Sequence, residues 1–138
     1  YQLLEARLAG ASGVLLMASV LDDAALGRLI SEATALGLDV LAESHTDAEL
    51  ARVLASGATI VGVNSRDLHT MAIDLDAMLR RLAEVPSRCV RVAESGMQDA
   101  GTVARVGEVA DAALLGTALM ASDDIGARIE ALGWARRR

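Results

Sequence analysis

The sequence predicts an α/β fold of the parallel (β/α) barrel type, the TIM barrel, present as an incomplete barrel of about five strands. Short apolar runs alternate with helical patterns along the chain, and no hairpin signal joins two runs. The runs are continuously apolar, as expected for parallel strands covered on both faces. Polar residues end several successive runs, which favours a barrel over an open doubly wound sheet. A complete barrel takes eight strands and about 250 residues, so 138 residues supply only part of one.

Length and apolar periodicity define the individual elements. The expected strands are Gly13 to Ala18, Asp39 to His45, Thr59 to Ser65, Arg88 to Ser95 and Ala112 to Leu119. The expected helices are Tyr1 to Leu8, Ala24 to Leu36, Thr46 to Ser56, about Asp74 to Ala83, Gln98 to Val109 and Asp123 to Leu132.

Capping residues support these boundaries. Asp22 and Asp23 place carboxylates in the first turn of the second helix, and Thr46 with Glu49 three residues later forms a capping box for the third. Ser122 is expected to cap the last helix. Helix stops are expected at Gly10, Gly37, Gly57, Pro86 and Gly133.

Composition restricts the class of protein. Hydrophobic residues make up 53% of the chain with no phenylalanine, so we expect a sizeable core of small side chains. No apolar run approaches the roughly 18 residues that span a bilayer, and no signal peptide is recognisable. The single cysteine, Cys89, is expected in the core and fits a reducing compartment. We therefore expect a soluble, cytoplasmic protein with no membrane partner.

Charge narrows the possible functions further. A net charge of -6 argues against a nucleic-acid partner, because phosphate-backbone binding needs a basic surface. The terminal Arg136, Arg137 and Arg138 are expected to be a solvated helix end. All 13 basic residues are arginine, so this polypeptide alone cannot run a mechanism that needs a lysine acid, base or Schiff base.

The stretch from Val61 to Leu68, V-G-V-N-S-R-D-L, shows how the expected strands end. β-branched residues give way to an amide at Asn64 and a guanidinium at Arg66, which places polar groups at a rim. Other strands end in the same way, with Glu43 and Ser44, with Glu94 and Ser95, and with Gly116 and Thr117. In a barrel these ends converge on one centre.

The two carboxylates at strand ends are candidates for proton transfer. Glu43 follows Val40, Leu41 and Ala42, and partial desolvation there favours the neutral form of a carboxyl group. Glu94 is a similar case. The alternative for Glu43 is a rim salt bridge, with Arg66 as the partner.

The last two strand ends favour phosphate binding. E-S-G at Glu94 to Gly96 and L-G-T-A-L at Leu115 to Leu119 provide glycines that let a phosphate approach backbone N–H groups. Ser95 and Thr117 add hydroxyl donors. The alternative is that each glycine only turns the chain. Neutral backbone dipoles explain how an acidic protein could bind an anion.

The two histidines give no metal signature. His45 directly precedes the cap Thr46, so we expect it beside a helix N-terminus instead of in catalysis, and His69 is expected in a solvated loop. No cysteine-rich pattern accompanies either residue, and no metal site is expected.

Five motifs carry a resemblance to a known family. They are Y-Q-L-L-E-A-R at Tyr1, L-A-E-S-H-T at Leu41, V-G-V-N-S-R-D-L at Val61, R-V-A-E-S-G at Arg91 and L-L-G-T-A-L-M at Leu114. Over essentially the whole chain and in this order, the sequence resembles the indole-3-glycerol phosphate synthase family of the tryptophan pathway. The resemblance implies that residues 1–138 are a single C-terminal portion of a (β/α)8 barrel domain, covering about its last five strands.

The resemblance also implies an activity. The family's enzymes are lyases that close the indole ring of 1-(2-carboxyphenylamino)-1-deoxyribulose 5-phosphate with loss of CO2 and water, using no cofactor and no metal. By motif position, the catalytic residues are Glu43 as general base or acid, Asn64 as the amide that orients the substrate, and Glu94. Arg66 and Ser95 are implied to bind the substrate. Gly96, Gly116 and Thr117 are implied to hold its phosphate.

Two departures from the family pattern bear on function. The usual E-V-H is E-S-H here, with Ser44 in the middle, and the usual N-N-R-D-L is N-S-R-D-L, with Ser65. The family's catalytic lysines belong to strands upstream of Tyr1, and no lysine is present. We therefore expect the 138-residue chain alone to be inactive.

Two other functions stay open at this point. One is another phosphate-binding barrel enzyme such as phosphoribosylanthranilate isomerase, against which N-S-R-D-L argues. The other is a non-catalytic part-barrel that associates with itself or with a missing N-terminal half, because open apolar edges invite pairing.

Overall fold

The structure is a computed structural model that describes residues 1–133. Strands and helices alternate along the chain, as the sequence predicts. In chain order the elements are α1 (Gln2–Leu8), β1 (Gly13–Met17), α2 (Asp23–Ala35), β2 (Asp39–Ser44), α3 (Asp47–Ala55), β3 (Ile60–Asn64), α4 (Leu75–Glu84), β4 (Val90–Glu94), α5 (Ala100–Gly107), β5 (Ala112–Leu114), α6 (Thr117–Met120) and α7 (Ile125–Leu132). The expected arginine-rich helix end at 136–138 lies outside the described residues.

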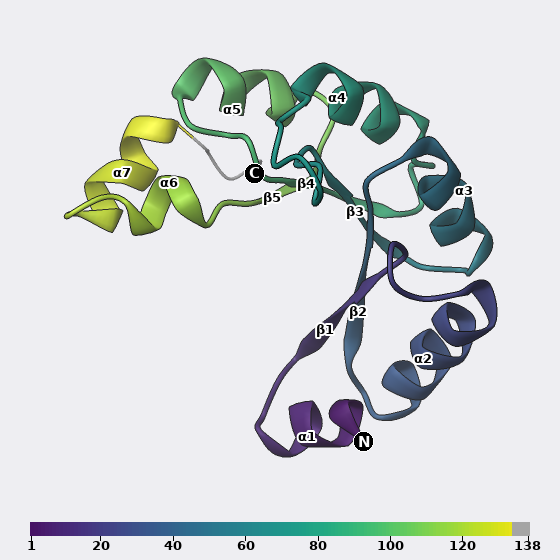
Figure 1. Ribbon diagram of the computed structural model, residues 1–138. Helices are drawn as coiled ribbons and strands as arrows, with labels where there is room; N and C mark the ends of the chain where they lie inside the picture. Colours follow the sequence, from purple (N-terminus) through teal and green to yellow (C-terminus); the bar gives the residue numbers. More distant parts are fainter. Residues whose placement is uncertain (134–138) are drawn as a thin grey trace.

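The five strands form one parallel sheet in the order β1-β2-β3-β4-β5. Helices α2, α3, α4 and α5 follow one another along the outside of this curved sheet (Figure 1). Helix α2 packs on β1 and β2, α3 on β2 and β3, and α4 on β3 and β4. A doubly wound sheet would reverse its strand order and carry helices on both faces. The predicted partial barrel is therefore confirmed, and within residues 1–133 its sheet stays open at β1 and β5.

The two faces of the sheet differ in what covers them. The outer face and the helices enclose the core, which includes Leu16, Val61, Val63, Ala93, Leu26, Leu50, Met78, Leu82 and the predicted Cys89. On the inner face, strand register aligns Leu15, Leu41, Ile60 and Val90 in one row. Leu15 is 43% and Val90 44% exposed. Within the described residues, the inner face thus carries an exposed apolar row.

The predicted fifth strand is wrong in its second half. Only Ala112–Leu114 pair with β4, and Thr117–Met120 form the short helix α6. An apolar run of this length does not by itself distinguish a strand from a helix. Gly116 is the N-cap of α6, so the glycine that we assigned to the interior of a strand marks its end.

Helix caps follow the sequence in most places. Asp22 caps α2 by accepting from the N–H of Ala25, and Thr46 caps α3 by accepting from that of Glu49. The prediction for Ser122 is wrong, because Asp124 caps α7 by accepting from the N–H of Ala127. The Ser122 hydroxyl instead donates to the Asp124 backbone carbonyl.

Successive helices are connected by aspartate–arginine ion pairs. In each pair, an aspartate in the first turn of one helix contacts an arginine of the next helix at 2.5 Å. The pairs are Asp23–Arg52, Asp47–Arg81 and Asp76–Arg105. Each exposed pair contributes about 1 kcal/mol or less. Each pair therefore links the N-terminal turn of one outer helix to the helix that follows it.

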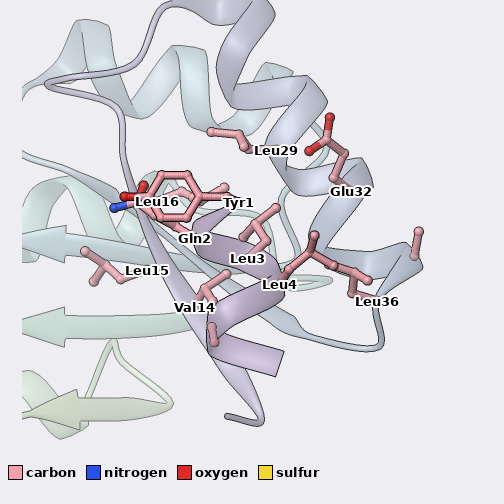
Figure 2. A pocket seen from close by; sticks show the side chains of 12 residues that line it. Tyr1, Gln2, Leu3, Leu4, Val14, Leu15, Leu16, Leu29, Glu32 and Leu36 are labelled. Atoms are coloured by element: carbon pink, nitrogen blue, oxygen red, sulfur yellow. The ribbon is translucent and has the colours of Figure 1, made fainter. Parts of the chain in front are cut away.

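A cavity of about 660 Å³ lies beside β1 and between α1 and α2 (Figure 2). Leucines and Val14 supply most of its lining, together with Tyr1 and Glu32. None of the residues that the sequence assigns to the functional site borders it. Among residues 1–133, no helix has the length and apolar character needed to span a membrane.

Candidate functional site

The predicted site residues collect at the carboxyl ends of β2, β3 and β4. Because side chains alternate between the faces of a strand, Glu43 shares the inner face with Leu41, and Glu94 shares it with Val92. Register places Glu43 beside Gly62, and Asn64 beside Glu94. The three residues assigned to catalysis therefore lie on adjacent strands, on the same side of the sheet.

Glu43 and Glu94 form a buried carboxyl pair. Glu43 is 5% and Glu94 2% exposed. The absence of a side chain at Gly62 makes room for the pair, because a Cβ there would lie 1.9 Å from Glu94 Oε1. Burial, the hydrogen bond with Glu43 and the charge of Glu43 raise the pKa of Glu94 to about 8. Glu94 therefore keeps its proton at neutral pH and can donate it to Glu43.

The ring of His45 contacts Glu43, one of the two members of the carboxyl pair. Its Nε2 lies 3.2 Å from Glu43 Oε1, and its Nδ1 lies 3.5 Å from Glu49 Oε2. Glu49 also accepts a hydrogen bond from the backbone N–H of His45 at 2.7 Å. The ring of His45, and not the Arg66 guanidinium of the alternative drawn from the sequence, is thus the side chain that contacts Glu43 here.

Asn64 and Arg66 border a cavity of about 430 Å³ together with His45 and Glu49. The side-chain oxygen of Asn64 accepts from the backbone N–H of Arg66 at 3.0 Å, which fixes the amide at the end of β3. Asp67 shapes the following loop. Hydrogen bonds from the backbone of Thr70 and then of His69 lower the pKa of that carboxyl group.

A second cavity, of about 240 Å³, unites the residues predicted to bind substrate and phosphate. Arg66, Ser95, Gly96, Gly116 and Thr117 all line it. Arg66 borders both cavities, whereas Glu43 and Glu94 are not among the residues that line either one.

The two glycines of this cavity have different physical roles. Gly96 adopts φ +79°, and a Cβ there would lie 2.8 Å from both Ile73 Cγ2 and Ser65 Oγ. Packing against the β3–α4 segment therefore requires this glycine, independently of any ligand. At Gly116 nothing lies within 4 Å of an added Cβ. That glycine faces open space, as a position that a ligand approaches does.

Sequence reasoning missed the contribution of His45 and Glu49. His45 does precede the cap of α3, as predicted, but its 9% exposed side chain is directed at Glu43. The spacing offered a signal: in E-S-H, residues 43 and 45 share one face of an extended chain. The sequence predicts Glu49 only as part of a capping box, yet its carboxylate also accepts from the backbone N–H of His45. In residues 1–133, no group of three or more His, Cys, Asp or Glu side chains could hold a metal ion.

Comparison with known proteins identifies the family. The model of indole-3-glycerol phosphate synthase matches residues 1–132. This chain belongs to the indole-3-glycerol phosphate synthase family. The motif-based resemblance is thereby confirmed, and the alternative isomerase family is set aside.

Relatives in this synthase family extend well beyond the matched region. An indole-3-glycerol phosphate synthase of Dehalococcoides mccartyi (strain CBDB1) is 43% identical over 133 residues, which are 96% of this chain and 51% of the relative. The corresponding protein of Mycobacteroides abscessus is 42% identical over 125 residues, covering 90% and 46%. The chain spans about half the length of these curated relatives.

Solved structures with low sequence identity share the fold. A thiamine phosphate pyrophosphorylase from Pyrococcus furiosus superimposes with a TM-score of 0.74 at 19% identity, covering 94% of this chain and 61% of that one. The 3-hexulose-6-phosphate synthase of Salmonella typhimurium gives the same TM-score and identity, with 94% and 64% coverage.

Proposed function

We propose that this chain is the C-terminal portion of an indole-3-glycerol phosphate synthase barrel and contributes residues to its substrate site. The substrate is 1-(2-carboxyphenylamino)-1-deoxyribulose 5-phosphate, which loses CO2 and water as the indole ring closes. The main support is the buried Glu43–Glu94 pair at the ends of β2 and β4, together with the two cavities that Arg66 borders; neither glutamate is among the residues that line those cavities.

The proposed proton transfers use the two carboxyl groups in different states. Ring closure joins an aromatic carbon to the substrate's carbonyl carbon, and the carbonyl oxygen takes up a proton. After CO2 leaves, the resulting hydroxyl departs as water and the CH2 carbon next to the ring nitrogen loses a proton, which completes the indole. Glu94, with its pKa raised to about 8, suits the donation of a proton to the leaving hydroxyl. In this proposal, Glu43 is the group that accepts a proton.

Substrate binding is assigned to the cavities on either side of Arg66. In this proposal, Asn64 orients the substrate, and the Arg66 guanidinium pairs with its carboxylate. Ser95, Gly96, Gly116 and Thr117 hold the phosphate through hydroxyl and backbone N–H groups. These donors carry no net charge, so the site is compatible with an acidic chain.

We propose that the proton donor for ring closure comes from outside this polypeptide, because the family resemblance implies a lysine in that role and the chain contains none. Loss of a general acid typically costs a factor of about 100 to 10,000. We expect no turnover by the purified 138-residue chain in an assay of indole-product fluorescence, and measurable turnover would contradict this.

A chimera tests the function itself. The N-terminal half of the Dehalococcoides mccartyi synthase, joined ahead of Tyr1, should restore turnover of the deoxyribulose phosphate. Glu43→Gln in the chimera should lower kcat by about 100-fold or more, whereas Glu84→Gln, at the outer end of α4, should not change it. A folded chimera without turnover would refute the proposed function.

We also propose that the missing barrel half, or a second copy of the chain, covers the inner face. The support is the exposed row that includes Leu15 and Val90, together with the unpaired edges of β1 and β5 within the described residues. The isolated chain should therefore self-associate. A clean monomer in sedimentation velocity would refute this part of the proposal.

A further inference from the structure

His45 has a 9% exposed, titratable side chain that the proposed chemistry does not use. Its ring lies between Glu43 of β2 and Glu49 of α3, with one nitrogen directed at each carboxylate, at 3.2 Å and 3.5 Å. Neither nitrogen makes an aligned hydrogen bond within the described residues. A buried imidazole whose donors are not satisfied costs free energy unless a second state aligns them.

The surroundings of His45 restrict how its ring can move. Thr46 caps α3, and the Glu49 carboxylate accepts from the backbone N–H of His45 at 2.7 Å, so Glu49 is fixed to the same turn of backbone as the ring. Glu43, in contrast, extends from the strand and is shared between His45 and Glu94. The ring therefore contacts one carboxylate that is held by the backbone beside it and one that also contacts Glu94.

We propose that His45 is a positioning residue for Glu43, with Glu49 supporting the ring from behind. The Nε2–H group of His45 donates to Glu43 Oε1 and directs the carboxylate at the substrate. Catalytic hydrogen bonds are often poorly aligned without substrate and tighten when it binds, which accounts for the 3.2 Å contact. This inference rests on the proposed function of Glu43.

Kinetics of the chimera provide the first test. A misdirected catalytic group costs up to about 100-fold in rate, so His45→Ala should lower kcat by about 10- to 100-fold and leave KM within about threefold. His45→Gln places an amide nitrogen near the position of Nε2 and should recover kcat to within about fivefold of the parent. A role limited to packing would not separate the alanine and glutamine variants in this way.

A double-mutant cycle tests the role of Glu49. Glu49→Gln should lower kcat by a few-fold in the parent and have no further effect in the His45→Ala background, because Glu49 acts through the ring. The matched control is Glu84→Gln, the same substitution at an exposed glutamate of α4 that lines neither cavity, and it should leave kcat unchanged. Independent, additive effects of Glu49→Gln and His45→Ala would overturn the supporting role.

The central proposal is overturned if kcat of His45→Ala stays within about twofold of the parent, or if His45→Gln is no better than His45→Ala. Nuclear magnetic resonance of the 138-residue chain provides a readout without activity. His45→Ala should shift the carboxyl ¹³C resonance of Glu43, and His69→Ala should not. An inactive parent chimera would refute the proposed function, while an unshifted Glu43 resonance would refute the positioning role itself.

Discussion

Replacing Glu94 by glutamine should remove a pH dependence from the stability of this chain. Glu94 is 2% exposed, and its pKa is raised to about 8 from a model-compound value of 4.5. Between these two pH values the unfolded chain releases a proton that the folded chain retains. The stabilisation is complete below pH 4.5 and is lost as the pH rises through 8.

The size of the effect follows from the linkage relation. One pH unit within this window changes the free energy of unfolding by about 1.4 kcal/mol. The free energy of unfolding of the parent chain should therefore fall by about 2 to 3 kcal/mol between pH 5 and pH 7. Glutamine keeps the shape of the side chain and a donor toward Glu43, but it does not titrate. In Glu94→Gln, the part of this fall in the free energy of unfolding that comes from Glu94 should be absent between pH 5 and pH 7.

Urea unfolding followed by circular dichroism at pH 5, 6, 7 and 8 measures this difference. Glu84→Gln, a change at the end of α4 on the molecular surface, is the matched control and should follow the parent over this range. Parallel curves for Glu94→Gln and the parent would refute the reasoning, because they would mean that Glu94 has the same pKa in the folded and unfolded chain.

Three further predictions concern glycines and the isolated chain. Gly62→Ala should push Glu94 away from Glu43 and lower the free energy of unfolding in urea by about 1 to 3 kcal/mol. Gly107→Ala is the control, because nothing lies within 4 Å of the added Cβ, and it should stabilise α5 by up to about 1 kcal/mol. Gly116→Ala should leave thermal unfolding unchanged but weaken inorganic phosphate binding to the chimera in calorimetry; equal affinity would contradict the phosphate assignment. Sedimentation velocity of the isolated chain should show self-association that Leu15→Glu on the inner face reduces.

Local signals were sufficient for the fold and for the chemical character of the rim. Continuous apolar strands, separated by capped helices, specify a parallel sheet whose polar residues collect at one edge. This reasoning failed between Ala112 and Leu119, where an apolar run contains both the short strand β5 and the helix α6. Periodicity cannot separate the two in so few residues, and only pairing with β4 shows where the strand ends.

The sequence by itself determined which residue types stand at the ends of β2, β3 and β4, and through its motifs it determined the family. Only the tertiary structure decided how these residues interact. Glu94 reaches Glu43 because strand register places Gly62, which has no side chain, between them. The pKa of Glu94 and the contact from His45 both depend on that register, and register comes from the packing of whole strands, which no local motif encodes.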